Sequence, residues 1–121
     1  LKPGELLTAI RLPARWAGAR FYFEKVEDRK AWDFALMTVA SAIRMNGNSI
    51  EESRLAVNGV APYPVRLGSI EALIEGQVPS DALGAKAGLL AVEKAQPLRH
   101  NDFKVPLMKN LVRRAVRGTE A

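Results

Sequence analysis

The chain has 121 residues, of which 48% are hydrophobic and 26% are charged, a balance typical of one folded globular domain. This composition argues against disorder, and no apolar run approaches the roughly 20 residues that a membrane-spanning helix needs. Cysteine is absent, which excludes disulfides, thiolate metal sites, iron–sulfur ligation and a cysteine nucleophile within these residues. The 18 Lys and Arg exceed the 13 Asp and Glu. Such a surplus suits an acidic partner, a phosphate-bearing ligand or nucleic acid, and is also ordinary for a globular domain.

The start of the chain shows neither a methionine nor a secretory signal. Lys2, Glu5 and Arg11 interrupt the apolar residues of segment 1–13, whereas a signal peptide has an uninterrupted apolar centre. We therefore expect a processed chain or a piece of a longer one.

Two strands are predicted near the start. Residues 5–12 form an apolar-rich run that Pro13 closes, since a proline tends to end strand pairing. Residues 20–26 are rich in aromatic side chains and predict a second strand, with the two phenylalanines on one face and the tyrosine on the other.

A hairpin is predicted next. Residues 32–45 are apolar nearly throughout, so periodicity alone does not distinguish a buried strand from a buried helix. The Asn-Gly pair at 46–47 favours a strand, because both residues tolerate the positive φ of a tight turn. Residues 50–60 then predict the returning strand. The inward alternation breaks between Ile50 and Leu55, which indicates a bulge or a late start of this strand.

The second half of the chain has helical patterns. We expect three helices, over 69–75, 80–95 and 101–118. The first begins at Ser69 and ends at Gly76, and the second begins at Ser80 with Asp81. The third begins at Asn101 or Asp102 and ends at Gly118. Strands first and helices after favour an α+β domain, in which about three helices pack on one face of an antiparallel sheet of about three to four strands. Residues 1–121 are expected to form a single domain.

Catalytic motifs are absent from the sequence. His100 is the single histidine, and without a second histidine or a cysteine we expect a surface or helix-capping role for it rather than a metal site. Glycine-rich phosphate loops and hydrolase serine motifs are also missing. Glu24 with Glu27, and Glu51 with Glu52, are the candidate acid–base pairs. Neighbours on a strand point to opposite faces, so a solvated strand is the better interpretation, and the chain alone is not expected to be catalytic.

The last helix carries basic residues opposite an apolar stripe. Lys109, Arg113 and Arg117 follow at intervals of four, and Arg114 widens this face. Such a face could follow nucleic-acid phosphates, but no known nucleic-acid module accompanies it. Cations are also favoured near any helix C-terminus. Nucleic acid is therefore not the expected partner. A stand-alone binding module for nucleic acid or an acidic protein remains the alternative hypothesis.

A second basic feature lies between the aromatic strand and the apolar strand. Lys25, Arg29 and Asp33 recur every four residues in a segment predicted as strand, loop and strand. They form either a solvated connection or an ion-paired set at the rim of a ligand site, because loops on a rigid scaffold commonly carry binding groups. The residues themselves leave both interpretations open.

Four stretches cover nearly the whole chain: LKPGELLTAIRLP, FYFEKVEDRKAWDFALMTVASAIRM, ESRLAVNGVAPYPVR and NDFKVPLMKNLVRRAV. In this order they resemble the C-terminal domain of the FAD-binding (medium) subunit of the xanthine dehydrogenase, aldehyde oxidase and carbon monoxide dehydrogenase family of molybdenum hydroxylases. The third stretch is similar to the family run Arg-x-Ala-x-Gly-Gly-Val-Ala-Pro-x-Pro-x-Arg. Asn58 replaces its first glycine, and asparagine tolerates the left-handed conformation.

The resemblance implies a cofactor arrangement. FAD would be held mainly by an N-terminal domain with glycine-rich loops, which is absent from these residues, while molybdopterin and iron–sulfur clusters would belong to partner subunits. Lys25, Arg29 and Asp33 match family positions and are the cofactor-binding candidates, with Arg29 and Asp33 shaping the loop beside the isoalloxazine. Trp32 departs from the family, in which this position is often acidic.

The resemblance therefore implies an accessory domain that covers the flavin side and docks to the N-terminal FAD domain and to the molybdopterin and iron–sulfur subunits. The whole enzyme would oxidise an aldehyde or a heteroaromatic compound, in the cytoplasm or the periplasm. A third hypothesis is an isolated domain that forms a homodimer through a sheet edge or through its uncovered flavin-facing surface.

Overall fold

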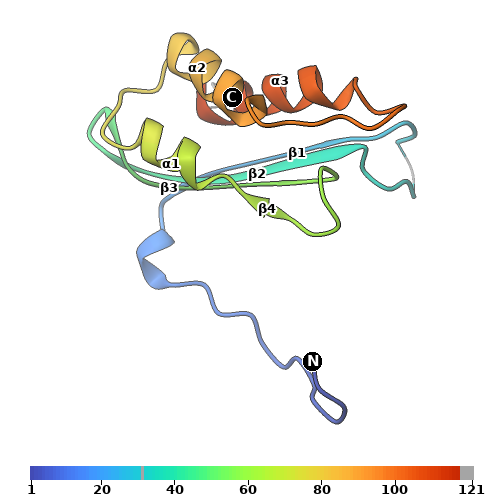
Figure 1. The fold of residues 1–121 in the computed structure, drawn as a ribbon. Helices are drawn as coiled ribbons and strands as arrows, with labels where there is room; N and C mark the ends of the chain where they lie inside the picture. The colour runs from blue at the N-terminus through green and yellow to red at the C-terminus, as the bar shows by residue number, and fades with distance from the viewer. Residues whose placement is uncertain (31, 118–121) are drawn as a thin grey trace.

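A computed structural model describes residues 1–30 and 32–117, which form an antiparallel sheet with helices on one face (Figure 1). The four strands are adjacent in chain order, β1-β2-β3-β4. The elements are β1 (Arg20–Val26), β2 (Met37–Asn46), β3 (Ser49–Asn58), β4 (Val65–Arg66), α1 (Gly68–Ile74), α2 (Asp81–Val92) and α3 (Lys104–Arg117). The α+β class predicted from the sequence is therefore confirmed.

Two strand predictions are wrong. Residues 5–12 belong to no strand, because no backbone in the described part of the chain pairs with them. Their leucine and isoleucine side chains are 63–83% exposed, and an isolated strand leaves its N–H and C=O groups to water. The second error is the start of β2, which begins at Met37 rather than at 32. The residues before it belong to the loop between β1 and β2, which Leu36 closes by donating its N–H to the Val26 carbonyl at 2.8 Å.

The hairpin of β2 and β3 contains the predicted bulge. Arg44 pairs with Glu52 and Met45 with Ile50, so Glu51 is an extra residue in β3. The extra residue restores the inward alternation of the strand. The bulge also corrects the expectation that Glu51 and Glu52 diverge. Both carboxylates contact the Arg44 guanidinium, at 2.9 and 3.0 Å.

The helices agree with the predicted pattern except at their ends. Ser80 caps α2 as expected, because its Oγ accepts the Leu83 N–H at 3.1 Å. Ser69 is not a cap, since α1 begins at Gly68 and its N-cap position makes no side-chain hydrogen bond. The α3 helix starts at Lys104, and its predicted stop at Gly118 lies outside the described residues. No helix of the described part is long and apolar enough to cross a membrane.

The core lies between the sheet and the helices. Its buried side chains come from the inward faces of β2 and β3 and from one face of each helix: Met37, Val39, Ile43, Ile50, Leu55, Val57, Ile70, Ile74, Leu83, Ala87, Met108, Leu111, Val112, Ala115 and Val116. The apolar stripe predicted for the last helix is therefore confirmed as a core face.

The helices α2 and α3 are in backbone contact. A Cβ added at Gly84 would lie 2.7 Å from the carbonyl oxygen of Arg113, and one added at Gly88 would lie 2.5 Å from the carbonyl oxygen of Lys109. The two glycines are four residues apart and so share one face of α2. Only glycine allows the helices to approach this closely.

The other face of the sheet is open. Phe21 and Phe23 lie on it with 65% and 67% exposure, and Tyr22 packs on the opposite, core side, as the alternation predicts. The segment before β1 extends away from this side (Figure 1). Its short 3-10 helix, Ala14–Trp16, places the Trp16 ring 5.4 Å from the Arg54 guanidinium, a cation–π distance.

Candidate functional site

The loop between β1 and β2 brings the three predicted site residues together. Lys25 Nζ donates a hydrogen bond to the carbonyl oxygen of Asp33 at 2.6 Å. The backbone N–H of Arg29 donates to the Asp33 carboxylate at 3.2 Å, and the Arg29 Nε lies 3.5 Å from the same oxygen. Asp33 is therefore the centre of this loop cluster.

Arg29 is the most accessible charge of the loop cluster. Its side chain is 77% exposed, whereas that of Asp33 is 21% exposed. Lys25 is partly neutralised, because its ammonium also forms an ion pair with Glu27. The loop thus presents a cation that is oriented by Asp33 and open to a ligand or a partner.

Two aromatic side chains beside the loop cluster are almost fully exposed. They are Trp32 and Phe34. Trp32 has a φ of 53°, the one positive φ of a non-glycine residue among residues 1–30 and 32–117, and a backbone of this kind costs about 1–2 kcal/mol. Sequence reasoning missed these side chains as surface groups because it placed them in a buried strand. The charged Asp33 between them is the signal against burial.

The loop is fixed at its far end by the connection between β3 and β4. Gly59 has a φ of 81°, and a Cβ at this position would lie 2.6 Å from the carbonyl oxygen of Leu36. This close approach explains why a glycine is needed there. Asn58, by contrast, ends β3 and is not among the described residues with positive φ, so its place in the motif does not require the left-handed conformation.

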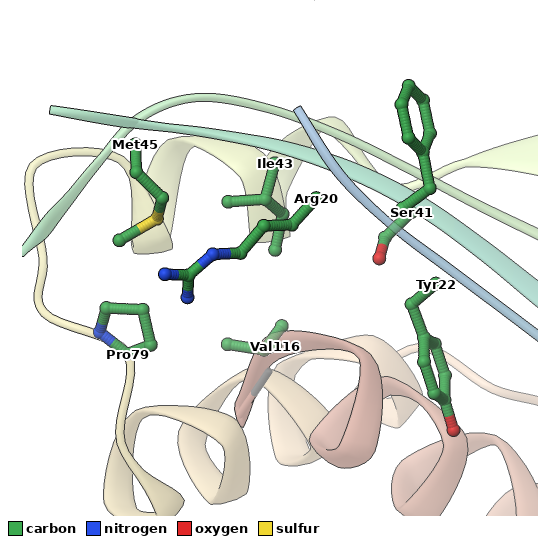
Figure 2. Close-up of a pocket in the computed structure, with 8 residues that line it drawn as sticks. Arg20, Tyr22, Ser41, Ile43, Met45, Pro79 and Val116 are labelled. Carbon is green, nitrogen blue, oxygen red and sulfur yellow. The ribbon is translucent and has the colours of Figure 1, made fainter. Parts of the chain in front are cut away.

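A cavity beneath the sheet is too small for a cofactor. It has a volume of about 20 Å³ and is lined by Tyr22, Ser41 and Val116, among other residues (Figure 2). The Ser41 Oγ is buried without a hydrogen-bond partner within the described residues, and Figure 2 shows it pointing from the sheet toward the helical layer. A space of this size accepts one water molecule. It therefore excludes a flavin at this place.

The basic side chains of α3 are engaged with carboxylates of the same chain. Arg114 donates two hydrogen bonds to Glu24 of β1, at 2.6 and 2.9 Å. Arg113 and Arg117 both form ion pairs with Asp81 at the start of α2. The hydrogen bond from Arg113 lowers the pKa of Asp81. These contacts support a structural role for the predicted basic face and leave fewer charges for nucleic-acid phosphates.

A buried carboxylate on α1 completes the edge of β3. β4 has only two residues, so part of β3 lies beyond its reach. Glu71 accepts the Leu55 N–H at 2.9 Å, and Glu75 accepts the Ser53 N–H at 2.9 Å. The Arg66 guanidinium binds Glu71 through two nitrogens, at 2.9 and 2.6 Å. Sequence reasoning missed this arrangement, although the predicted helix 69–75 contains two glutamates four residues apart, which is a signal that they act on the same neighbour.

The pKa of Glu71 follows from opposing effects. Burial raises it, whereas the hydrogen bonds from Arg66 and the Leu55 N–H lower it, and the net result is a pKa below the usual 4.5. A carboxyl with a lowered folded-state pKa stabilises the fold above its unfolded-state pKa and loses that contribution as the pH falls through the folded-state value.

We therefore expect acid to weaken the fold partly through Glu71. The urea concentration at half-unfolding should fall between about pH 6 and about pH 3, and the fall should be smaller in the Glu71→Gln variant, which has no carboxyl to protonate at this position. Urea titrations at both pH values, followed by circular dichroism, measure this difference. The same fall in both proteins would show that Glu71 does not contribute to the pH dependence.

Comparison with known proteins identifies the family. The family model for the CO dehydrogenase flavoprotein C-terminal domain matches residues 21–119. The aldehyde oxidoreductase FAD-binding subunit PaoB of Escherichia coli is 36% identical over 111 residues, which are 90% of this chain and 31% of that protein. The carbon monoxide dehydrogenase medium chain of Hydrogenophaga pseudoflava is 30% identical over 125 residues, covering 100% of this chain and 43% of that protein.

Solved structures agree with this assignment. A chain of the reconstituted CO dehydrogenase from Oligotropha carboxidovorans superposes with a TM-score of 0.81 and 27% identity, over 98% of this chain and 42% of that one. A chain of quinoline 2-oxidoreductase from Pseudomonas putida 86 has a TM-score of 0.75 at 24% identity, over 88% of this chain and 37% of that one, and supports the fold. The chain spans less than half the length of the curated relatives named above. It belongs to the CO dehydrogenase flavoprotein C-terminal domain family, as its four motifs predict.

Proposed function

We propose that residues 1–121 are the C-terminal domain of the FAD-binding subunit of a molybdenum-containing oxidoreductase and that the β1–β2 loop lies beside the flavin. The relatives support the first part, since one is named as an FAD-binding subunit and another as the medium chain of a carbon monoxide dehydrogenase. The loop cluster of Lys25, Arg29 and Asp33 supports the second part, because it presents an oriented and accessible cation.

The loop suits the flavin as one wall of a site, not as its cradle. Arg29, Trp32 and Phe34 all face solvent, so the described residues of the loop do not enclose a ligand by themselves. Another domain must then hold most of the cofactor, and the N-terminal part of the longer relatives is the proposed source. Exposed aromatic groups are suited to stacking on a planar ring or to burial in an interface.

The loop residues would act by charge and position. FAD, when bound, supplies the electron-transfer chemistry, and the protein supplies orientation and electrostatics. A guanidinium held by Asp33 beside the ring would favour the negative charge that reduction adds. Lys25 would keep the loop closed through its hydrogen bond to the Asp33 carbonyl.

The partners follow from the same proposal. Trp32 and Phe34 would pack against the N-terminal FAD domain, while molybdopterin and iron–sulfur subunits would complete the complex. The whole enzyme would oxidise an aldehyde or a heteroaromatic compound. The names of two relatives fit an aldehyde substrate: one is an aldehyde oxidoreductase and the other is a glyceraldehyde dehydrogenase.

An Arg29→Ala variant of the intact enzyme tests the site. We expect the rate of flavin reduction or reoxidation, followed at the flavin absorbance in a stopped-flow instrument, to change by about fivefold, because one charge near the ring is worth about 1 kcal/mol in a solvated setting. Lys30→Ala is the matched control, since it removes an exposed cation from the adjacent position of the same loop. Flavin kinetics that are unchanged in Arg29→Ala would remove Arg29 from the site.

A further inference from the structure

We propose that the chain has a separate binding site for a small organic anion with an apolar body, in the cavity between β4, the end of α2 and the start of α3. This cavity has a volume of about 330 Å³. Sites for small molecules in proteins begin at about 300 Å³. The cavity is therefore large enough for a short-chain or aromatic carboxylic acid. This inference goes beyond the proposed flavin contact and does not depend on it.

The walls of the cavity are largely apolar. Val65 and Leu67 contribute from β4 and the residue after it, Ala91 from α2, and Val105 and Met108 from α3. Leu67 and Met108 also belong to the core, so this wall is continuous with the packed interior of the domain. An apolar ligand body in contact with it would be removed from water, which is the main source of affinity for small ligands of this kind.

The polar groups of the cavity are mainly hydrogen-bond donors. Lys94 and Lys104 both line it, and neither takes part in an ion pair among residues 1–30 and 32–117. Asn101 lines it too. Its side-chain Oδ1 accepts the Leu98 N–H at 2.6 Å, which leaves the N–H groups of its side-chain amide as donors. None of the lining residues within 1–30 and 32–117 is an Asp or Glu. A site with these groups favours a ligand that supplies acceptors and a negative charge.

The positions of the lysines strengthen this preference. Lys104 is the first residue of α3, where the positive end of the helix dipole adds to its charge. Its Nζ also donates to the Gly59 carbonyl at 2.6 Å, which fixes the ammonium at the cavity wall. Lys94 lies just after α2 and is exposed, so it can close over a bound carboxylate. The cavity adjoins Gly59, and the start of α3 and the β3–β4 connection lie at the same end of the sheet as the β1–β2 loop (Figure 1).

The first test is a titration of the ¹⁵N-labelled 121-residue chain with hexanoate, followed by ¹H–¹⁵N spectra. We expect saturable shifts at the amides of Gly59, Ala91 and Val105, with a Kd in the millimolar range for so small a ligand. Hexanol has the same apolar chain without the charge, and it should bind about two- to fivefold more weakly. Equal binding of hexanol would overturn the preference for an anion. Shifts that do not saturate, or that appear instead on the open face at Phe21 and Phe23, would overturn the site.

Two variants locate the binding further. Lys94→Gln should raise the Kd for hexanoate about two- to fivefold. Lys86→Gln should leave it unchanged, because Lys86 is exposed on α2 but does not line the cavity. Ala91→Leu should remove the shifts by filling the cavity, and its own spectrum shows whether the chain is folded. Unaltered hexanoate binding in both Lys94→Gln and a folded Ala91→Leu would place the ligand elsewhere and refute the proposal.

Discussion

Gly88→Ala is expected to destabilise the chain by about 1–3 kcal/mol, although the same change in an exposed helix usually stabilises it by about 0.5–1 kcal/mol. The reason is the contact between α2 and α3. An alanine Cβ would lie 2.5 Å from the Lys109 carbonyl oxygen, a backbone atom that cannot rotate away. The helices must then separate, and the core side chains between them lose contacts. Urea unfolding followed by far-ultraviolet circular dichroism measures the change.

The chain offers a matched control for this prediction. Gly68 is the first residue of α1, and a Cβ placed there meets nothing within 4 Å. Gly68→Ala should therefore cause no loss of stability. Gly84→Ala should destabilise like Gly88→Ala, because its Cβ would lie 2.7 Å from the Arg113 carbonyl oxygen. If Gly88→Ala proves as stable as Gly68→Ala, the two helices are not in backbone contact.

The parts of the fold with local signals were predictable. The Asn-Gly pair identifies the β2–β3 hairpin because its residues tolerate positive φ, and Gly47 has a φ of 57°. Ser80 identifies the start of α2 through its own hydrogen bond to Leu83. The broken alternation after Ile50 indicates the bulge. In each case the interacting residues are close in the sequence, so the local sequence pattern is enough to predict the local structure.

The parts that depend on distant contacts were not predictable in this way. Residues 5–12 have the composition of a strand, but pairing requires a partner strand that the described residues do not provide. The glycines at 84 and 88 predict only a weak helix from the sequence. Their role, which is to allow close packing against the α3 backbone, depends on a contact with a distant part of the chain. Glu71 has the sequence signature of an ordinary helical glutamate, and its partner amide lies in β3.

The candidate site was predictable in part. The spacing of Lys25, Arg29 and Asp33 left a solvated connection and an ion-paired set both open, and the structure brings all three together in the loop. The exposed aromatic pair of Trp32 and Phe34 could not be recognised while the strand boundary was placed at 32. The flavin contact itself involves groups outside these residues, so it stays a prediction that the Arg29 variant can test.

Glu71→Ala is expected to cost about 1–4 kcal/mol. The Glu71 side chain is 6% exposed, and it is the acceptor for the Leu55 N–H, which β4 is too short to satisfy. An unsatisfied buried N–H costs about 1–3 kcal/mol, and the loss of the charged partner of Arg66 adds up to about 1 kcal/mol because that arginine is largely exposed. Chemical unfolding at neutral pH measures the loss, and Glu51→Ala on the exposed bulge is the control with little expected effect.

A second substitution at the same position separates the two contributions. Glu71→Gln keeps an amide oxygen that can accept the Leu55 N–H, and it removes only the charge that faces Arg66. We therefore expect it to cost at most about 1 kcal/mol, less than Glu71→Ala. This order would mean that the helix α1 is held to the sheet chiefly because its carboxylate takes the place of a missing strand. Equal losses in the two variants would mean instead that the ion pair with Arg66 holds it, and that the β3 amide finds another acceptor.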